Sequence, residues 1–199
     1  MLASMKKMTA VLALLLAGVL TLASCGDDDG TPEGGDSAGA EFNDADVQFA
    51  QDMIPHHEQA VLMAEMAESH ADSAEVKDLA AGIEAAQGPE IETMTRWLED
   101  WGQDAPSGDM GHGDMGHGSA SQMPGMMDED ALSDLDGAMG GDWDQMFLTM
   151  MIEHHEGAIE MAQAEQSDGE NADAIALAEQ IESGQTAEIE VMQDLLLAE

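Results

Sequence analysis

Residues 49–64 read FAQDMIPHHEQAVLMA, and residues 147–162 read FLTMMIEHHEGAIEMA. The phenylalanine, the Met-Ile pair, the His-His-Glu triplet, one alanine and the closing Met-Ala recur at a constant offset of 98 residues. The offset continues into the segments that follow, where the matched pairs are Leu79/Leu177, Ile83/Ile181, Gln87/Gln185, Glu90/Glu188, Ile91/Ile189, Met94/Met192 and Leu98/Leu196. The repeat is therefore longer than one motif, and it decides the fold.

The first stretch has the periodicity of an amphipathic helix. On a helix, one of its faces carries apolar and imidazole side chains, namely Met53, His56, His57, Ala60 and Met63. Acidic and amide side chains occupy the opposite face, and the second stretch repeats the pattern. The spacing therefore predicts two helices that direct His-His pairs and methionines inward.

The residues around the motifs predict two tandem helical hairpins, over 43–101 and 142–199. The expected helices cover about residues 43–69, 74–101, 142–166 and 171–198. Neither hairpin can bury its one-sided apolar face alone, so the two faces are expected to pack together. The prediction is an all-α, single-domain four-helix bundle with a pseudo-twofold axis. Residues 102–141 are rich in glycine and predict a linker without a packed core.

Residues 1–24 have the pattern of a secretory signal peptide, with two lysines before an uncharged run that is too short for a stable membrane span. Residues 22–25, LASC, resemble the lipobox of bacterial lipoproteins, so we expect cleavage before Cys25 and a lipid on that cysteine. A plain signal peptide or short anchor with an incidental cysteine is the alternative. Residues 25–42 would tether an exported protein to the outer face of the cytoplasmic membrane or to the cell envelope.

The formal net charge is −39 at pH 7, and after the predicted signal peptide only Lys77 and Arg96 oppose 43 acidic residues. Such a surface attracts cations and disfavours nucleic-acid binding, although charge of this kind is often only a solvated face. Cys25 is the only cysteine, so the chain has no internal disulfide and no thiolate metal site. Soft-metal chemistry must come from methionine and histidine.

Four imidazoles directed into a small apolar core need hydrogen-bond partners or a metal, because an unpaired buried polar group costs about 1–3 kcal/mol. Thioethers and imidazoles together suit copper, with Cu(I) preferred and Ag(I) or Cu(II) as further candidates. The predicted bundle ligands are Met53, His56, His57, Met63, Met151, His154, His155 and Met161. The alternative is that the methionines fill gaps in the core and the histidines pair with Glu or Gln across the bundle.

Gln87 and Gln185 interrupt the apolar stripe of the second helix in each hairpin. We expect both amides to hydrogen bond the imidazoles and so to orient them as metal ligands. Glu90 and Glu188 either serve in the same way or face solvent.

The glycine-rich linker carries a second signal for metal binding. It contains two Met-x-His units, formed by Met110, His112, Met115 and His117, and then Met123, Met126 and Met127. A flexible glycine-rich segment can wrap a metal, so these units predict an auxiliary copper site. Weak Zn or Ni binding, or low complexity without a function, are the alternatives.

Residues 49–64 and 147–162 resemble the hallmark F-x-x-x-M-I-x-H-H-x-x-A-x-x-M-A of the family called domain of unknown function 305, or DUF305. The resemblance covers residues 44–198. It implies a ferritin-like helical bundle in an exported protein. Some members of that family are described as copper-binding and linked to copper tolerance, which implies the same class of ligand here.

The sequence thus predicts a lipid-anchored extracytoplasmic protein, not an enzyme, that binds copper for buffering, tolerance or delivery. Its expected partners are the metal ion, the membrane and a copper donor or acceptor protein, and the possibility of a homodimer stays open. A di-iron oxidase is the enzymatic alternative, but Glu-x-x-His is absent and Pro55 replaces the carboxylate that Glu153 offers. A metal-independent interaction module with pH-sensitive histidines is the third candidate.

Overall fold

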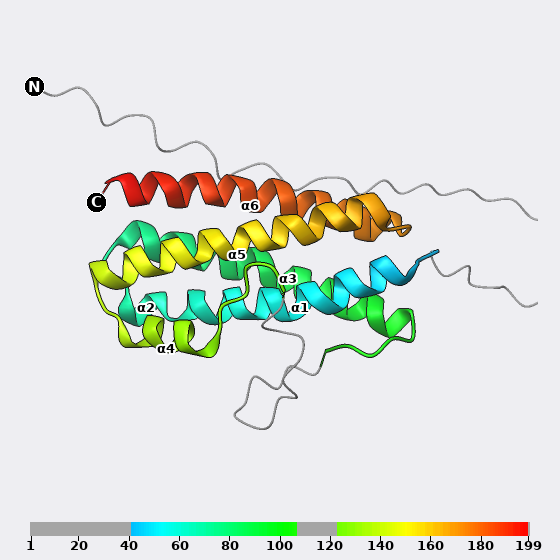
Figure 1. Ribbon diagram of the computed structural model, residues 1–199, viewed down its shortest axis with the longest axis horizontal. Coiled ribbons are helices and arrows are strands. Elements are labelled where there is room, and N and C mark those ends of the chain that lie inside the picture. The colour runs from blue at the N-terminus through cyan, green and yellow to red at the C-terminus, as the bar shows by residue number, and fades with distance from the viewer. Residues whose placement is uncertain (1–40, 107–122, 199) are drawn as a thin grey trace, which may run out of the picture. The chain divides into compact units, whose positions relative to one another are not determined.

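The computed structural model describes residues 41–106 and 123–198, and every regular element within them is a helix. The elements are α1 (Asp44–Glu65), α2 (Ala67–His70), α3 (Ala74–Asp100), α4 (Glu129–Gly137), α5 (Gly141–Asp168) and α6 (Ala172–Ala198). Figure 1 shows the four long helices α1, α3, α5 and α6 running alongside one another, with α2 and α4 together near one end. The prediction of an all-α helical bundle is confirmed.

The long helices pack in two pairs. α1 packs mainly against α3, and α5 packs mainly against α6. α1 and α5 pack on each other and so join the two pairs, whereas α3 and α6 meet over a smaller area. None of the helices in the two described ranges is long and apolar enough to cross a bilayer. The predicted signal peptide and Cys25 lie outside the described residues.

Side-chain caps explain where the helices begin. The Asn43 side chain accepts hydrogen bonds from the backbone N–H groups of Ala45 and Asp46. The Asp46 carboxylate accepts in return from the Asn43 N–H at 2.6 Å, which completes a capping box at the start of α1. Ser73 and Asn171 cap α3 and α6 through their own side-chain oxygens. These polar residues lie at the expected helix starts.

The first helix of each pair also binds the turn of the other pair. The Asp46 carboxylate accepts from the backbone N–H groups of residues 170–171, at 3.1 and 2.8 Å. Asp144, which follows Asp46 by 98 residues, accepts from the N–H groups of residues 72–73, at 3.1 and 2.8 Å. Both carboxylates are buried. Because the two contacts obey the same offset, the pairs pack with the symmetry of the sequence repeat.

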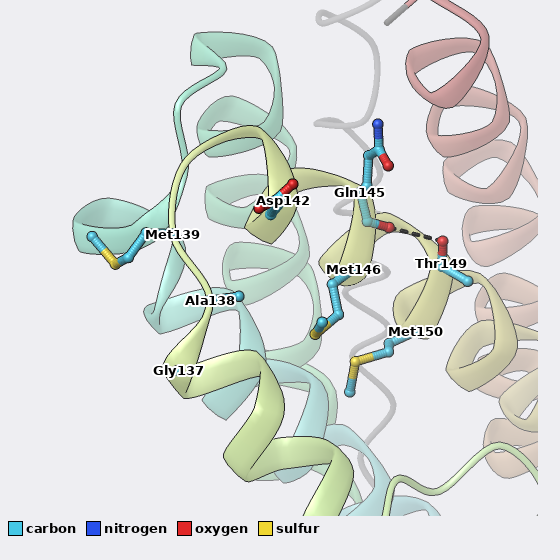
Figure 2. A pocket seen from close by; sticks show the side chains of 8 residues that line it. All are labelled: Gly137, Ala138, Met139, Asp142, Gln145, Met146, Thr149 and Met150. Carbon is cyan, nitrogen blue, oxygen red and sulfur yellow. Dashed lines mark hydrogen bonds between the residues drawn. The ribbon is translucent and has the colours of Figure 1, made fainter.

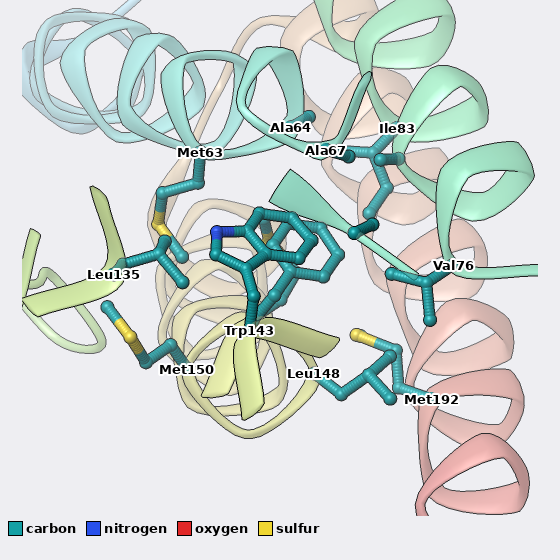
Figure 3. Packing of buried hydrophobic residues seen from close by; sticks show 14 of the residues in the cluster. Met63, Ala64, Ala67, Val76, Ile83, Leu135, Trp143, Leu148, Met150 and Met192 are labelled. Carbon is teal, nitrogen blue, oxygen red and sulfur yellow. The ribbon is translucent and has the colours of Figure 1, made fainter. Parts of the chain in front are cut away.

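Two apolar clusters fill the bundle. The tryptophan cluster is centred on Trp143, which stacks on Phe147 with ring centroids 4.8 Å apart. Figure 3 shows Trp143 enclosed by side chains from several helices, among them Met63, Ile83, Leu135, Leu148 and Met192. The Phe49 cluster consists of Phe49, Ala50, Met53, Ile54, Met94, Leu98, Ala158, Ala162, Ala178 and Ile181. The His-His pairs lie between the two clusters along α1 and α5.

The prediction that residues 102–141 lack a packed core is wrong for the part of this segment that follows residue 122. There the chain forms α4, whose first turn is capped by Asp128, and Leu135 is fully buried in the tryptophan cluster. Leucine and alanine at helical spacing bury one side of α4, and the glycine-rich composition upstream concealed that pattern. Gly140 has a φ of +66°, and its N–H donates to the His70 carbonyl just before α5 begins.

Candidate metal centre

The two motifs converge on one layer in the middle of the bundle. His56 and His57 of α1 and His154 and His155 of α5 are all fully buried. The rings of His56 and His154 have centroids 3.8 Å apart and planes inclined by 40°. Helical periodicity directs the four rings inward, and the packing of α1 on α5 brings the two copies together. We call the four rings the histidine layer.

One histidine of each motif is held by a carboxylate of the neighbouring helix. His57 Nε2 lies 2.8 Å from Glu90 Oε2, and His155 Nε2 lies 2.7 Å from Glu188 Oε2. The ring nitrogen donates, because a carboxylate oxygen accepts. In the neutral ring Nδ1 then carries the lone pair, which is the arrangement that carboxylates impose on metal-ligating histidines.

The other histidine of each motif has a different environment in the two copies. His56 Nε2 lies 3.0 Å from the Pro124 carbonyl oxygen, which can only accept, so His56 also carries its proton on Nε2. His154 has no hydrogen-bond partner at either ring nitrogen. The hydrogen bonding therefore does not follow the sequence repeat at His56 and His154.

Burial keeps these two rings neutral. Burial and, as a smaller cause, the neighbouring His57 lower the pKa of His56 to about 3. Burial likewise holds the pKa of His154 well below its ordinary value, with the adjacent histidines adding to the effect. Neutral imidazole is the form that binds metals, so both rings have lone pairs available at neutral pH.

The middle of the bundle contains an unusual number of unpaired polar atoms. Nδ1 of all four histidines is buried without a hydrogen-bond partner. Each such atom costs roughly 1–3 kcal/mol if nothing occupies it. A bound metal is one way in which such buried nitrogens are satisfied.

Gln87 and Gln185 are buried but do not hydrogen bond the imidazoles. Both ends of each side-chain amide have no hydrogen-bond partner. Glu90 and Glu188 contact the imidazoles in place of the amides, so of the two alternatives left open for these carboxylates, contact with the histidines is the one observed. The sequence signal was their separation of 33 residues from the second histidine of each motif, equal in both copies.

The predicted methionine ligands are at two distances from the histidine layer. Met53 and Met151 are fully buried and precede the first histidine of their motif by one helical turn. Met63 and Met161 follow the second histidine by about 9 Å along the helix axis, among apolar side chains. Along the helix axis, Met53 and Met151 are therefore closer to the histidines than Met63 and Met161 are. The linker residues Met110, His112, Met115 and His117 lie outside the described residues.

Nitrogen and oxygen ligands alone do not form a closed site. Within residues 41–106 and 123–198, no three His, Cys, Asp or Glu side chains are close enough together to hold a metal ion. An ion that requires several hard ligands does not fit this arrangement.

A hollow of the described surface lies elsewhere. It has a volume of about 760 Å³ and is lined by residues of the α4–α5 connection and of α5, among them Met139, Met146 and Met150. Figure 2 shows Met146 and Met150 on one side of α5, with Met139 directed away from them. The hollow contains none of the histidines.

Comparisons with known proteins agree with this architecture. The family model described as "Domain of unknown function (DUF305)" matches residues 46–196. No curated protein matches the chain. A DUF305 protein from Streptomyces coelicolor is similar in structure, with a TM-score of 0.66, 33% identity, and coverage of 77% of this chain and 93% of that one.

Two further solved structures show the same fold. A DUF305 fragment from Deinococcus radiodurans has a TM-score of 0.68 and 29% identity, with coverage of 79% of this chain and 98% of that one. CopM in its Cu(II)-bound form has a TM-score of 0.64 and 33% identity, with coverage of 77% and 96%. CopM has also been solved in Cu(I)-bound and silver-bound forms. The family match spans nearly all of the described helices, and the chain belongs to the DUF305 family.

Proposed function

We propose that this protein binds Cu(I) in the histidine layer, outside the cytoplasm, and that it buffers or delivers the ion and is not an enzyme. The observation that carries the proposal is the set of four buried Nδ1 atoms without a partner. A purely structural histidine layer would pair these atoms, because leaving them unpaired destabilises the fold.

The ligands we propose are imidazole nitrogens of the histidine layer together with the thioethers of Met53 and Met151. His56 and His154 have the closest rings of the layer and are neutral. The two methionines are the fully buried sulfurs nearest in sequence to these histidines. Thioether and imidazole form a ligand set that selects Cu(I), and Ag(I) has the same preference for soft ligands.

Glu90 and Glu188 contact the imidazoles of His57 and His155 at Nε2, the ring nitrogen that does not bind the metal in this proposal. Each accepts a hydrogen bond from a buried imidazole, and each is itself about one-quarter exposed, at 23% and 25%. A carboxylate in this position fixes the ring orientation and makes the metal-binding nitrogen more basic. Gln87 and Gln185 have unpaired amides in the same helices and are available to hydrogen bond once a bound metal reorients the rings.

The relatives support copper as the ion. CopM was solved with Cu(I), with Cu(II) and with silver, and it shares 30–33% of its residues with this chain in the two copper forms. A DUF305 relative is assigned as secreted, which supports an exported location. Lipidation at Cys25, an accessory role for Met110, His112, Met115 and His117, and transfer to a partner protein remain part of the proposal.

An anaerobic Cu(I) titration of residues 38–199 against a chromogenic chelator tests the proposal. The described residues of this stretch belong to one compact unit. We expect tight binding that is lost when His56, His57, His154 and His155 are all replaced by glutamine, with folding checked by circular dichroism. If the folded variant binds as the wild type does, the copper site is not in the histidine layer. If the variant fails to fold, single replacements of His56 and His154 give the same comparison.

A further inference from the structure

Residues 123–127, which we call the strap, cross α1 and α5 at the level of the histidine layer. The Pro124 carbonyl accepts a hydrogen bond from His56. The backbone of Met127 pairs twice with the Gln59 side chain, since Gln59 Nε2 donates to the Met127 carbonyl at 2.9 Å and the Met127 N–H donates to Gln59 Oε1 at 2.8 Å. Gln59 is only 3% exposed, so water does not compete for these bonds. The strap is thus fixed to α1 at two points, and one of them is a proposed metal ligand.

On α5 the strap lies directly against a glycine. A Cβ at Gly157 would collide with the Pro124 carbonyl and would lie 2.7 Å from the Gly125 nitrogen. Gly125 has a φ of +75°, and a Cβ there would lie 2.6 Å from the Glu153 carbonyl oxygen. Only glycine permits this approach at both positions.

Gln59 and Gly157 occupy equivalent positions in the two repeats, 98 residues apart. The first repeat supplies the side chain that binds the strap, and the second omits a side chain so that the strap can pass. The strap therefore accounts for the difference between the two repeats at this one position. Its consequence is seen at the equivalent histidines, because His56 has a partner at Nε2 and His154 has none at either nitrogen.

We propose that the strap, Gln59 and Gly157 are positioning elements that make the two halves of the histidine layer chemically different. The Pro124 carbonyl holds His56 in one tautomer, so that Nδ1 is its metal-binding atom. His154 has no such restraint and can present either nitrogen. The inference rests on the proposed copper site. It assigns one asymmetric site in place of two equal sites, because the metal-binding nitrogen is fixed in His56 and can vary in His154.

The tautomer of His56 gives a readout that packing alone would not change. Long-range ¹H–¹⁵N NMR correlations of the imidazoles, recorded on the soluble chain without metal, distinguish protonated from unprotonated ring nitrogens. We expect wild-type His56 to be protonated only at Nε2. We expect Gln59→Ala, which releases the strap, to convert His56 into a mixture of tautomers. Gln163 is an exposed glutamine on α5. Gln163→Ala is the control, and we expect it to leave the tautomer of His56 unchanged.

A pair of glycine variants tests the contact of the strap with α5. Gly157→Ala cannot coexist with the strap in place, whereas a Cβ at Gly184 of α6 meets nothing within 4 Å. We expect Gly157→Ala to mix the tautomers of His56 and to weaken Ag(I) binding by about tenfold or more, the size of effect typical for groups that orient metal ligands. We expect Gly184→Ala to change neither quantity.

The outcomes separate this inference from the proposed function. If His56 keeps one tautomer in both Gln59→Ala and Gly157→Ala, the strap does not position it and the inference is overturned, even where affinity falls. If the tautomer shifts as expected but the wild type binds neither Ag(I) nor Cu(I), the strap positions His56 and the proposed copper site is wrong. A tautomer shift together with weakened Ag(I) binding supports both.

Discussion

His57 and Glu90 are joined by a hydrogen bond of 2.8 Å from Nε2 to Oε2, and the repeat places His155 and Glu188 in the same relationship at 2.7 Å. The same contact is formed twice, 98 residues apart, and in each copy it orients a fully buried imidazole of the histidine layer. We therefore expect Glu90→Gln with Glu188→Gln to weaken Cu(I) binding by about tenfold, because a neutral amide supports the imidazole less than a carboxylate does.

The control for this change is Glu92→Gln with Glu190→Gln. These two residues are also related by the repeat, and both are exposed. Chelator competition should show no change in Cu(I) affinity for the control. Equal losses in the two double variants would attribute the effect to the overall negative charge and not to the histidine contacts.

Met53→Leu with Met151→Leu should weaken Cu(I) and Ag(I) binding far more than Cu(II) or Zn(II) binding. Leucine preserves the volume of the core but removes the soft sulfur, so stability should change by less than about 1.5 kcal/mol for each replacement. Met94→Leu with Met192→Leu is the matched control, since both residues are fully buried and related by the repeat. Equal losses for all four ions would rule out thioether ligation.

Metal-free stability should fall on acidification below pH 6.5. Burial lowers the folded-state pKa of His56 to about 3, so between the two values the unfolded chain binds a proton that the folded chain does not. The free energy of unfolding then rises with pH by about 1.4 kcal/mol per unit for each such histidine. The free energy of unfolding, measured with urea, should differ less between pH 7.5 and pH 5.5 for His56→Gln than for the wild type. His70→Gln, at a partly exposed position, should behave as the wild type.

Glu165 should have the opposite pH dependence. Burial, the neighbouring Asp46 carboxylate and the negative charge of Asp168 raise its pKa to about 8. The folded chain therefore binds the extra proton, and this contribution to stability is complete below pH 4.5 and lost as the pH rises through 8. Glu165→Gln should be more stable than the wild type at pH 9 and should lose this dependence. Glu160→Gln, at an exposed position of the same helix, should keep it.

The fold was predictable because its determinants are local and occur twice. The apolar spacing of residues 49–64 specifies a helix by itself, and the repeat at 147–162 supplies the surface on which it packs. Caps such as Asn43 and Ser73 are also short-range signals. The same spacing directed the four histidines inward, where the structure places them.

The parts that sequence did not predict depend on contacts between distant segments. Periodicity favoured Gln87 as the partner of an imidazole, and only the packed geometry shows that Glu90, nearly one turn further on, reaches His57. The strap belongs to no repeat, and its neighbours in sequence are rich in glycine. The sequence shows that Gln59 of the first repeat is replaced by Gly157 in the second. It does not show that the strap packs against both positions.

We propose that copper binds in the histidine layer between α1 and α5. The most direct test is a crystal structure of the Cu(I)-loaded protein with anomalous diffraction recorded at the copper edge. We predict an anomalous peak within bonding distance of Nδ1 of His56 and of a sulfur of Met53 or Met151. A well-occupied peak only at another place, such as the hollow lined by Met146 and Met150, with none in the histidine layer, would contradict the claim.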